Sequence, residues 1–242
     1  MSSTQKQRNR AATRASKGPN RSANRTWWVV IALVVVLGLA AVIAVAGSGG
    51  DSGNGGKATA HETGAVQVVG KALPAYDDPS NDTAVGKTIP TLHGISFDGS
   101  PVTIEPNGKP QAIVFLSHSC PHCQAEMPRL VALSKQGKLA GVDVTAVTTN
   151  TSPELPNYPP SAWLKRAGWP YPVLADSKND DAARAYGLTA FPYFVLVDAQ
   201  GKVVIRGTGE VTDASIVKVF KALASGEATG TPSNGASTPA SQ

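Results

Sequence analysis

The sequence predicts an α/β domain with a mixed central sheet flanked by helices, preceded by one transmembrane helix. Three observations lead to this prediction. Between residues 64 and 224, apolar segments typical of strands alternate with segments typical of helices. The apolar segment 112–117 runs directly into a helical segment that opens with two cysteines. Closer to the N-terminus, residues 27–46 form an uncharged, apolar run that is long enough to cross a bilayer.

The first half of the domain is typical of a β-hairpin, a buried strand and a long helix. Residues 91–104 contain two strand patterns separated by an Asp-Gly dipeptide, which favours a tight hairpin turn. Residues 112–117 are continuously apolar, as expected of a strand that is buried on both faces of a sheet. The following helix should run from the cysteine pair to about Lys135, because Gly137 lies just beyond it.

The second half of the domain continues the alternation. The expected elements are a strand at 142–149, a proline-rich loop at 151–160, a helix at 161–168, a strand at 171–176, a helix at 177–187, a hairpin at 193–207 and a last helix at 212–224. Ser177 and Thr212 should cap the last two helices, because their hydroxyls can accept a hydrogen bond from the first helical turn. Gly187 is expected to end the shorter of these helices.

Residues 27–46 predict a transmembrane helix. A helix of this length spans roughly 30 Å, which matches the hydrocarbon core of a bilayer. Residues 1–26 carry several basic side chains and no acidic one, so the positive-inside rule predicts a basic cytoplasmic tail and an extracytoplasmic domain. A cleaved signal peptide is the alternative, since Ala44-Val45-Ala46 fits a cleavage pattern, but the apolar run is longer than usual for one.

Two further segments have the composition of flexible chain. Residues 47–63 are rich in Gly, Ser, Asn and Thr and predict a linker. Residues 225–242 are of low complexity and predict a disordered tail, which leaves 64–224 as the folded domain. The basic charge of the chain is concentrated before residue 27, next to the apolar run. We therefore expect the lipid bilayer as a partner of residues 27–46, and no nucleic acid.

Cys120 and Cys123 are the only cysteines, and their position at the start of a helix suits redox chemistry. Only a thiolate attacks a disulfide, and the positive end of a helix dipole stabilises a thiolate. Cys120 should therefore be the exposed, attacking sulfur, and Cys123 should resolve the mixed disulfide from one turn further in. Pro121 suits the first helical turn, and His122, when protonated, would add positive charge beside Cys120.

Other uses of the cysteine pair are possible. A zinc site needs four ligands, and His118 and His122 are the only histidines close to the pair in sequence. A structural disulfide across so short a loop would constrain the unfolded chain very little. Carriage of a metal such as copper, by the thiolates and a histidine, remains a non-catalytic alternative. The redox interpretation is preferred and requires no cofactor and no metal.

The order of strand, Cys-x-x-Cys and helix, followed by Phe191-Pro192 before an apolar strand, resembles the thioredoxin superfamily. It is most similar to the membrane-anchored TlpA- and ResA-like thiol–disulfide oxidoreductases of the redoxin type, in which Pro128 would bend the active-site helix. This resemblance implies a thioredoxin-like fold with an N-terminal β-hairpin extension, and a redox-active disulfide between Cys120 and Cys123. It also implies a cis bond before Pro192 and a substrate groove at Phe191 and Pro192.

The direction of electron flow is open at the level of sequence. Cys-Pro-His-Cys is the motif of strongly oxidising DsbA proteins, whereas the TlpA-like frame is typical of reductants. Stabilising the thiolate of the reduced form raises the potential, so the motif favours an oxidant or isomerase. The alternative is a reductant for cytochrome c maturation. In either case the expected partners are protein thiols and disulfides outside the membrane, and a membrane redox partner.

Glu126, Arg206 and His118 are three polar residues that we expect to be structural or solvated. By the resemblance, thioredoxins have a buried acid at the position of Val114, and Glu126 could replace that acid as the group that takes a proton from Cys123. The simpler expectation is that Glu126 is a solvated residue of the helix. Arg206 is expected on a solvated face. His118 is expected to be a polar residue at a strand end, with tuning of the first thiolate as the alternative.

Overall fold

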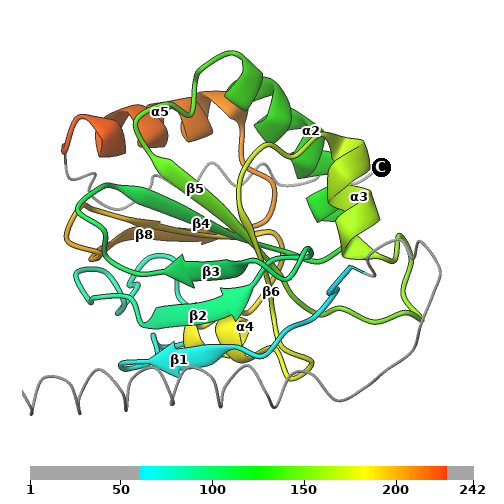
Figure 1. The fold of residues 1–242 in the computed structure, drawn as a ribbon. Helices are drawn as coiled ribbons and strands as arrows, with labels where there is room; N and C mark the ends of the chain where they lie inside the picture. The colour runs from blue at the N-terminus through cyan, green and yellow to red at the C-terminus, as the bar shows by residue number, and fades with distance from the viewer. Residues whose placement is uncertain (1–59, 228–242) are drawn as a thin grey trace, which may run out of the picture. The chain divides into compact units, whose positions relative to one another are not determined.

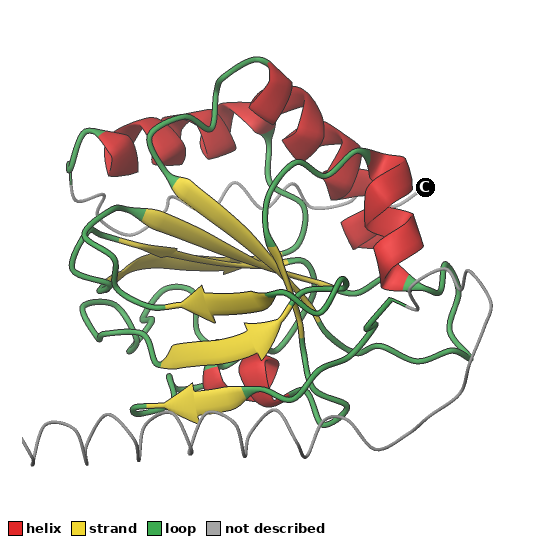
Figure 2. Ribbon diagram, viewed as in Figure 1, coloured by secondary structure: helices red, strands yellow, loops and turns green. Residues whose placement is uncertain are grey.

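The computed structural model describes residues 60–227, in which helices cover both faces of one sheet. Helices α2 (Pro121–Lys135), α3 (Pro160–Ala167) and α5 (Asp213–Ala224) lie on one face (Figure 1). The short helix α4 (Asp181–Ala185) lies on the other face, and Figure 2 shows the sheet between the two layers. This arrangement confirms the predicted α/β class.

The sheet is mixed, as predicted. Its strands run in the order β1-β2-β6-β5-β4-β7-β8, and β3 pairs with β2 outside this path. Strands β4, β5 and β6 are parallel neighbours, whereas β7 and β8 are antiparallel. Strands β2 and β3 form the expected N-terminal hairpin. The bounds are β1 (Gln67–Val69), β2 (Thr91–Ile95), β3 (Pro101–Ile104), β4 (Gln111–Leu116), β5 (Asp143–Thr148), β6 (Val173–Ala175), β7 (Tyr193–Val197) and β8 (Val203–Thr208).

Strand β4 lies in the middle of the sheet and is buried along its whole length. Its side chains alternate between two hydrophobic cores. Ala112, Val114 and Leu116 belong to the core that includes α2 and α5, whereas Ile113 and Phe115 belong to the core that includes α4. Burial on both faces explains why the segment is apolar without alternation. The strand ends just before α2 and so fixes where that helix begins.

Helix α4 is shorter than predicted. The sequence pattern indicates a helix over 177–187, but Asp180 has a φ of 55°, which takes it out of the right-handed helical region. Ser177 nevertheless acts at the helix start, because its hydroxyl accepts a hydrogen bond of 3.2 Å from the first helical N–H. Gly187, with a φ of +72°, follows the helix end as predicted.

The other helices end where their sequence signals indicate. Helix α2 ends at Lys135, one residue before the C-cap, and Gly137 lies beyond it with positive φ. The side chain of Thr212 accepts a hydrogen bond of 3.3 Å from the N–H of Ser215, which confirms it as the cap of α5.

The residues just before the sheet are attached to the domain earlier than the predicted boundary at residue 64. The N–H of His61 donates to the carbonyl of Phe97 at 2.7 Å. The carboxylate of Glu62 accepts from both the backbone N–H, at 2.9 Å, and the hydroxyl of Ser161, at the start of α3. The last residues of the predicted linker therefore belong to the folded domain.

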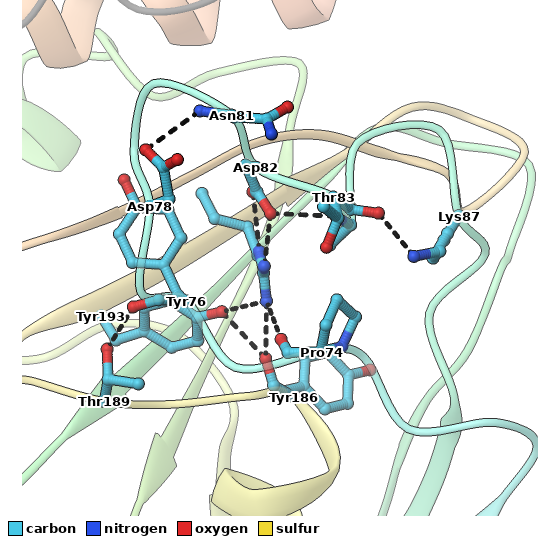
Figure 3. A network of polar contacts seen from close by, with 12 residues as sticks. Pro74, Tyr76, Asp78, Asn81, Asp82, Thr83, Lys87, Tyr186, Thr189 and Tyr193 are labelled. Atoms are coloured by element: carbon cyan, nitrogen blue, oxygen red, sulfur yellow. Dashed lines mark hydrogen bonds and ion pairs between the residues drawn. The ribbon is translucent and has the colours of Figure 1, made fainter.

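The predicted solvent exposure of Arg206 is wrong. Instead of facing solvent, it is 2% exposed in β8. Its guanidinium donates to both carboxylate oxygens of Asp82, to the carbonyl of Pro74 at 2.9 Å and to the hydroxyl of Tyr193 at 2.9 Å. It also lies over the ring of Tyr76, and Figure 3 shows these groups converging. The segment before β2 is thus held against β7 and β8 by a buried ion pair.

Several predictions fall outside the described residues. These are the basic tail at 1–26, the transmembrane helix at 27–46, most of the linker at 47–63 and most of the tail at 225–242. Among residues 60–227, no helix has both the length and the apolar character needed to cross a bilayer.

Candidate active site

The two cysteines occupy the start of α2. Cys120 is the N-cap residue, with extended backbone angles, and Pro121 follows as the first helical residue, as predicted. The side chain of Cys120 is partly buried, whereas that of Cys123 is completely buried. Both are free thiols in the described part of the chain. The accessible sulfur therefore lies at the positive end of the helix dipole, with the second sulfur behind it.

The buried position of Cys123 controls its acidity. Burial raises the pKa of the Cys123 thiol far above its ordinary value, against a lowering contribution from a backbone hydrogen bond at Ser117. The neighbouring Cys120 and Glu126 raise this pKa further. Cys123 therefore keeps its proton until a nearby base removes it, as expected of a resolving cysteine.

Glu126 is the site residue that the sequence interpretation placed wrongly. It is not solvated; its side chain is 0% exposed. Arg129 donates to its Oε2 at 3.0 Å, whereas its Oε1 has no hydrogen-bond partner among residues 60–227. Burial raises the pKa of Glu126 to about 7, although the positive charge of Arg129 opposes the rise. One signal in the sequence could have indicated this burial: Glu126 lies three residues after Cys123, so both side chains are on one face of the helix.

His122 contacts a carboxylate from a distant loop. Its Nδ1 lies 2.8 Å from Oε1 of Glu210, in the loop between β8 and α5. The same loop is attached beside Pro192, because the N–H of Gly209 donates to the carbonyl of Pro192 at 2.9 Å. Glu210 lies 88 positions from His122 along the chain, and no local pattern indicates this contact.

The Phe191–Pro192 peptide bond is cis, which confirms the geometry that the resemblance implied. Phe191 is partly buried and packs against the same hydrophobic core as Cys120. The structure therefore places Phe191, one of the two predicted groove residues, and the first cysteine over one core. Their contact with a substrate stays a prediction.

His118 is a buried structural residue. It is 1% exposed, and its Nδ1 lies 2.7 Å from the carbonyl of Pro156. A carbonyl can only accept, so Nδ1 carries the hydrogen, and Nε2 accepts from the N–H of Ser152 at 3.4 Å. The ring of Tyr158 packs edge-on against it. His118 thus fixes the proline-rich loop beside the site, and both its nitrogens are occupied.

Metal chemistry has no ligand set in the described region. Across residues 60–227, no three His, Cys, Asp or Glu side chains come together in an arrangement that could hold a metal ion.

Comparison with known proteins identifies the family. The Redoxin family model matches residues 84–222. The chain belongs to the Redoxin family. This Redoxin domain contains both cysteines, the helix that carries them and the cis-proline, so the chain is a thioredoxin-like thiol–disulfide oxidoreductase related to ResA and TlpA.

The relatives of this Redoxin protein include named thiol–disulfide enzymes. The thiol-disulfide oxidoreductase ResA of Halalkalibacterium halodurans is 30% identical over 149 residues, which cover 62% of this chain and 79% of the relative. The thiol:disulfide interchange protein HelX of Rhodobacter capsulatus is 25% identical over 122 residues, which cover 50% and 65%. A conserved protein of Geobacillus kaustophilus, described as uncharacterized, has a similar structure: the TM-score is 0.53, the identity 25%, and the match covers 62% and 86% of the two chains.

Proposed function

We propose that this Redoxin protein is a membrane-anchored, extracytoplasmic reductant that transfers electrons from Cys120 and Cys123 to disulfides of partner proteins. The observation that carries the proposal is the pair of sulfurs at the start of α2, one accessible and one completely buried behind it. This arrangement suits a dithiol that attacks with one sulfur and resolves with the other.

The proposed reaction balances within the two thiols and the substrate. The thiolate of Cys120 attacks one sulfur of the substrate disulfide; that S–S bond breaks, a mixed disulfide forms, and the first substrate sulfur leaves as a thiolate. Cys123 then loses its proton and attacks the sulfur of Cys120, which releases the second substrate thiolate and forms the Cys120–Cys123 disulfide. Two electrons pass from the dithiol to the substrate, and the protons of the two cysteines match those the substrate thiols take up.

Glu126 is the group that we propose accepts the proton of Cys123. It is buried on the same helix face, and its pKa of about 7 lies close to neutral pH, which is where an acceptor and donor of protons works best. Its Oε1, which has no hydrogen-bond partner among the described residues, can still take part in a hydrogen bond.

The likeness to ResA and HelX supports the reductant alternative rather than the oxidant that the Cys-Pro-His-Cys motif suggested. In this structure the His122 ring of that motif is hydrogen-bonded to the carboxylate of Glu210, which opposes the positive charge that a protonated His122 would place beside Cys120. Because TlpA- and ResA-like proteins are associated with cytochrome c maturation, we propose disulfides of apocytochrome c as the substrate class.

The anchoring and the electron supply belong to the same proposal. Residues 27–46 would span the membrane, with the basic tail in the cytoplasm and the Redoxin domain outside. Each turnover leaves a disulfide between the two cysteines, so a dithiol of a membrane redox partner would have to reduce it before the next cycle.

The reduction potential of the full-length protein tests this proposal. The purified chain is equilibrated with mixtures of reduced and oxidised glutathione, and the state of the cysteines is read by thiol labelling. We expect a potential below about −230 mV, near the range of thioredoxin. A potential above about −150 mV would instead assign the chain to the oxidants, and failure of the cysteines to cycle would reject the redox function altogether.

A further inference from the structure

The His122–Glu210 contact joins the active-site helix to a loop that lies next to the cis-proline. His122 is the second residue of α2 and is separated from Cys120 only by Pro121. The histidine side chain is 66% exposed and the carboxylate side chain is 43% exposed. Neither residue is needed to fill a core, so the contact has no packing role that explains it.

The loop that carries Glu210 is fixed on both sides of this residue. The N–H of Gly209 bonds to the carbonyl of Pro192, and the carbonyl of Val211 accepts from the guanidinium of Arg129 on α2. These bonds hold the backbone on both sides of Glu210 against the domain, and from there its partly exposed side chain reaches His122 in the first turn of α2. The backbone position of Glu210 is therefore set by the fold and not by the ion pair alone.

We propose that Glu210 is a redox-tuning residue that neutralises the charge of His122 beside Cys120. An imidazolium at this position attracts the thiolate of the reduced form and raises the reduction potential. A carboxylate that accepts a hydrogen bond from the same ring opposes that attraction. The pair allows a Cys-Pro-His-Cys motif to operate in a reductant, an inference that rests on the function proposed above.

Three other charged groups belong to this region. Glu126 and Arg129, on α2, are both influenced by the charge of Glu210, and Asp213, in the first turn of α5, bonds to Arg129. Arg129 bonds to the carboxylates of Glu126 and Asp213, at 3.0 Å and 2.8 Å, so its charge is already balanced. Glu210 is the acidic group that bonds to the histidine ring, which makes it the carboxylate whose removal changes the charge next to Cys120.

The experiment measures the ionisation of Cys120 in four full-length proteins that carry Cys123→Ser, so that a single thiol titrates. These are the parent, Glu210→Gln, His122→Asn and the double variant, and thiolate is followed by its ultraviolet absorbance against pH. We expect Glu210→Gln to increase the acid dissociation constant of Cys120 about two- to fivefold, the range of a partly exposed ion pair. His122→Asn should decrease it, and the double variant should return close to the parent.

A matched control removes another exposed, ion-paired carboxylate. Asp143 pairs with Lys109 at 3.8 Å and lies at the start of β5, beside the first residue of β4, at the end of that strand opposite the cysteines. Asp143→Asn should leave the ionisation of Cys120 unchanged. Raising the salt concentration should shrink the effect of Glu210→Gln, because screening weakens exposed charge interactions.

The outcome separates this inference from the proposed function. Opposite shifts that cancel in the double variant support tuning by Glu210, whatever the absolute potential of the protein. If Glu210→Gln has no effect, or shifts Cys120 in the same direction as His122→Asn, the tuning role is rejected. In the protein with both cysteines, the same fold-change in the equilibrium with glutathione corresponds to roughly 10 to 20 mV, and the wild-type value itself tests the reductant assignment.

Discussion

Replacing Glu126 by glutamine should stabilise the fold increasingly as the pH rises. In the unfolded chain this carboxyl has an ordinary pKa near 4.5, and burial raises the pKa of Glu126 to about 7 in the folded protein. Because the folded-state pKa is the higher one, stability that is present below pH 4.5 is lost as the pH rises through 7. Glutamine stays neutral, so this loss disappears from the variant.

The size of the effect follows from the pKa difference. One pKa unit corresponds to about 1.4 kcal/mol, so the raised pKa of Glu126 costs the folded state about 3 kcal/mol at pH 8 but only about 1 kcal/mol at pH 5, where the folded carboxyl still keeps its proton. The free energy of unfolding of wild type and Glu126→Gln would be measured by urea denaturation at both pH values. We expect the difference between the proteins to change by about 2 kcal/mol in favour of the variant between pH 5 and pH 8.

The informative quantity is how the difference in free energy of unfolding between the two proteins changes from pH 5 to pH 8. The difference at a single pH also contains a constant penalty of about 1 to 3 kcal/mol, because the NH₂ group of the glutamine lacks a hydrogen-bond partner. The Asp143→Asn protein serves as a control for loss of a solvated carboxylate. If wild type and Glu126→Gln lose stability in parallel from pH 5 to pH 8, the burial argument for the raised pKa is wrong. The same variant should resolve mixed disulfides more slowly at neutral pH, and an unchanged rate would remove Glu126 from the proton transfer.

Three more predictions follow from particular contacts. Cys123→Ser should trap a mixed disulfide through Cys120 on incubation with an oxidised partner, seen as a shift in non-reducing electrophoresis; release of the partner at the wild-type rate would contradict the resolving role. Asp82→Asn should lower the free energy of unfolding by about 3 to 5 kcal/mol, because Arg206 would be left as a buried charge without its counter-ion. A loss below about 1 kcal/mol would show that water reaches the arginine despite its burial. Gly187→Ala should destabilise the fold more than Gly86→Ala in urea denaturation. Both glycines have positive φ, but only at Gly187 would the new Cβ meet a backbone atom, the carbonyl oxygen of Pro74 at 2.1 Å. Equal losses would mean that backbone strain alone sets the cost of both substitutions.

Local sequence signals predicted the scaffold of the site. The continuous apolar run of β4, the proline at the start of α2 and the Thr212 cap each depend on residues within one or two turns of chain. Such signals reflect local backbone preferences and burial on a sheet, which adjacent residues determine. The resemblance added the cis bond at Pro192, which the residues alone did not indicate.

Long-range contacts explain what was missed. Glu126 shares a helix face with Cys123, but its complete burial depends on Arg129 and on the loop before α5, which bond to each other beside it. Arg206 has its counter-ion 124 residues away in the sequence, in a loop without a strong pattern. The contact between His122 and Glu210 was not predicted, for the same reason. In each case the environment of a charged group is set by a distant segment, which a single sequence does not reveal.

The buried Arg206–Asp82 pair also affects where the chain can be cut. The family match begins at residue 84, so a fragment designed on that boundary would keep the arginine and discard its counter-ion. It would also lose Glu62 and its hydrogen bonds to the start of α3. A soluble fragment for crystallisation or titration should therefore begin upstream of residue 61, and one begun at residue 84 should express poorly and be digested quickly by proteases. We therefore expect the smallest stable unit of this protein to begin before the region that the family model matches.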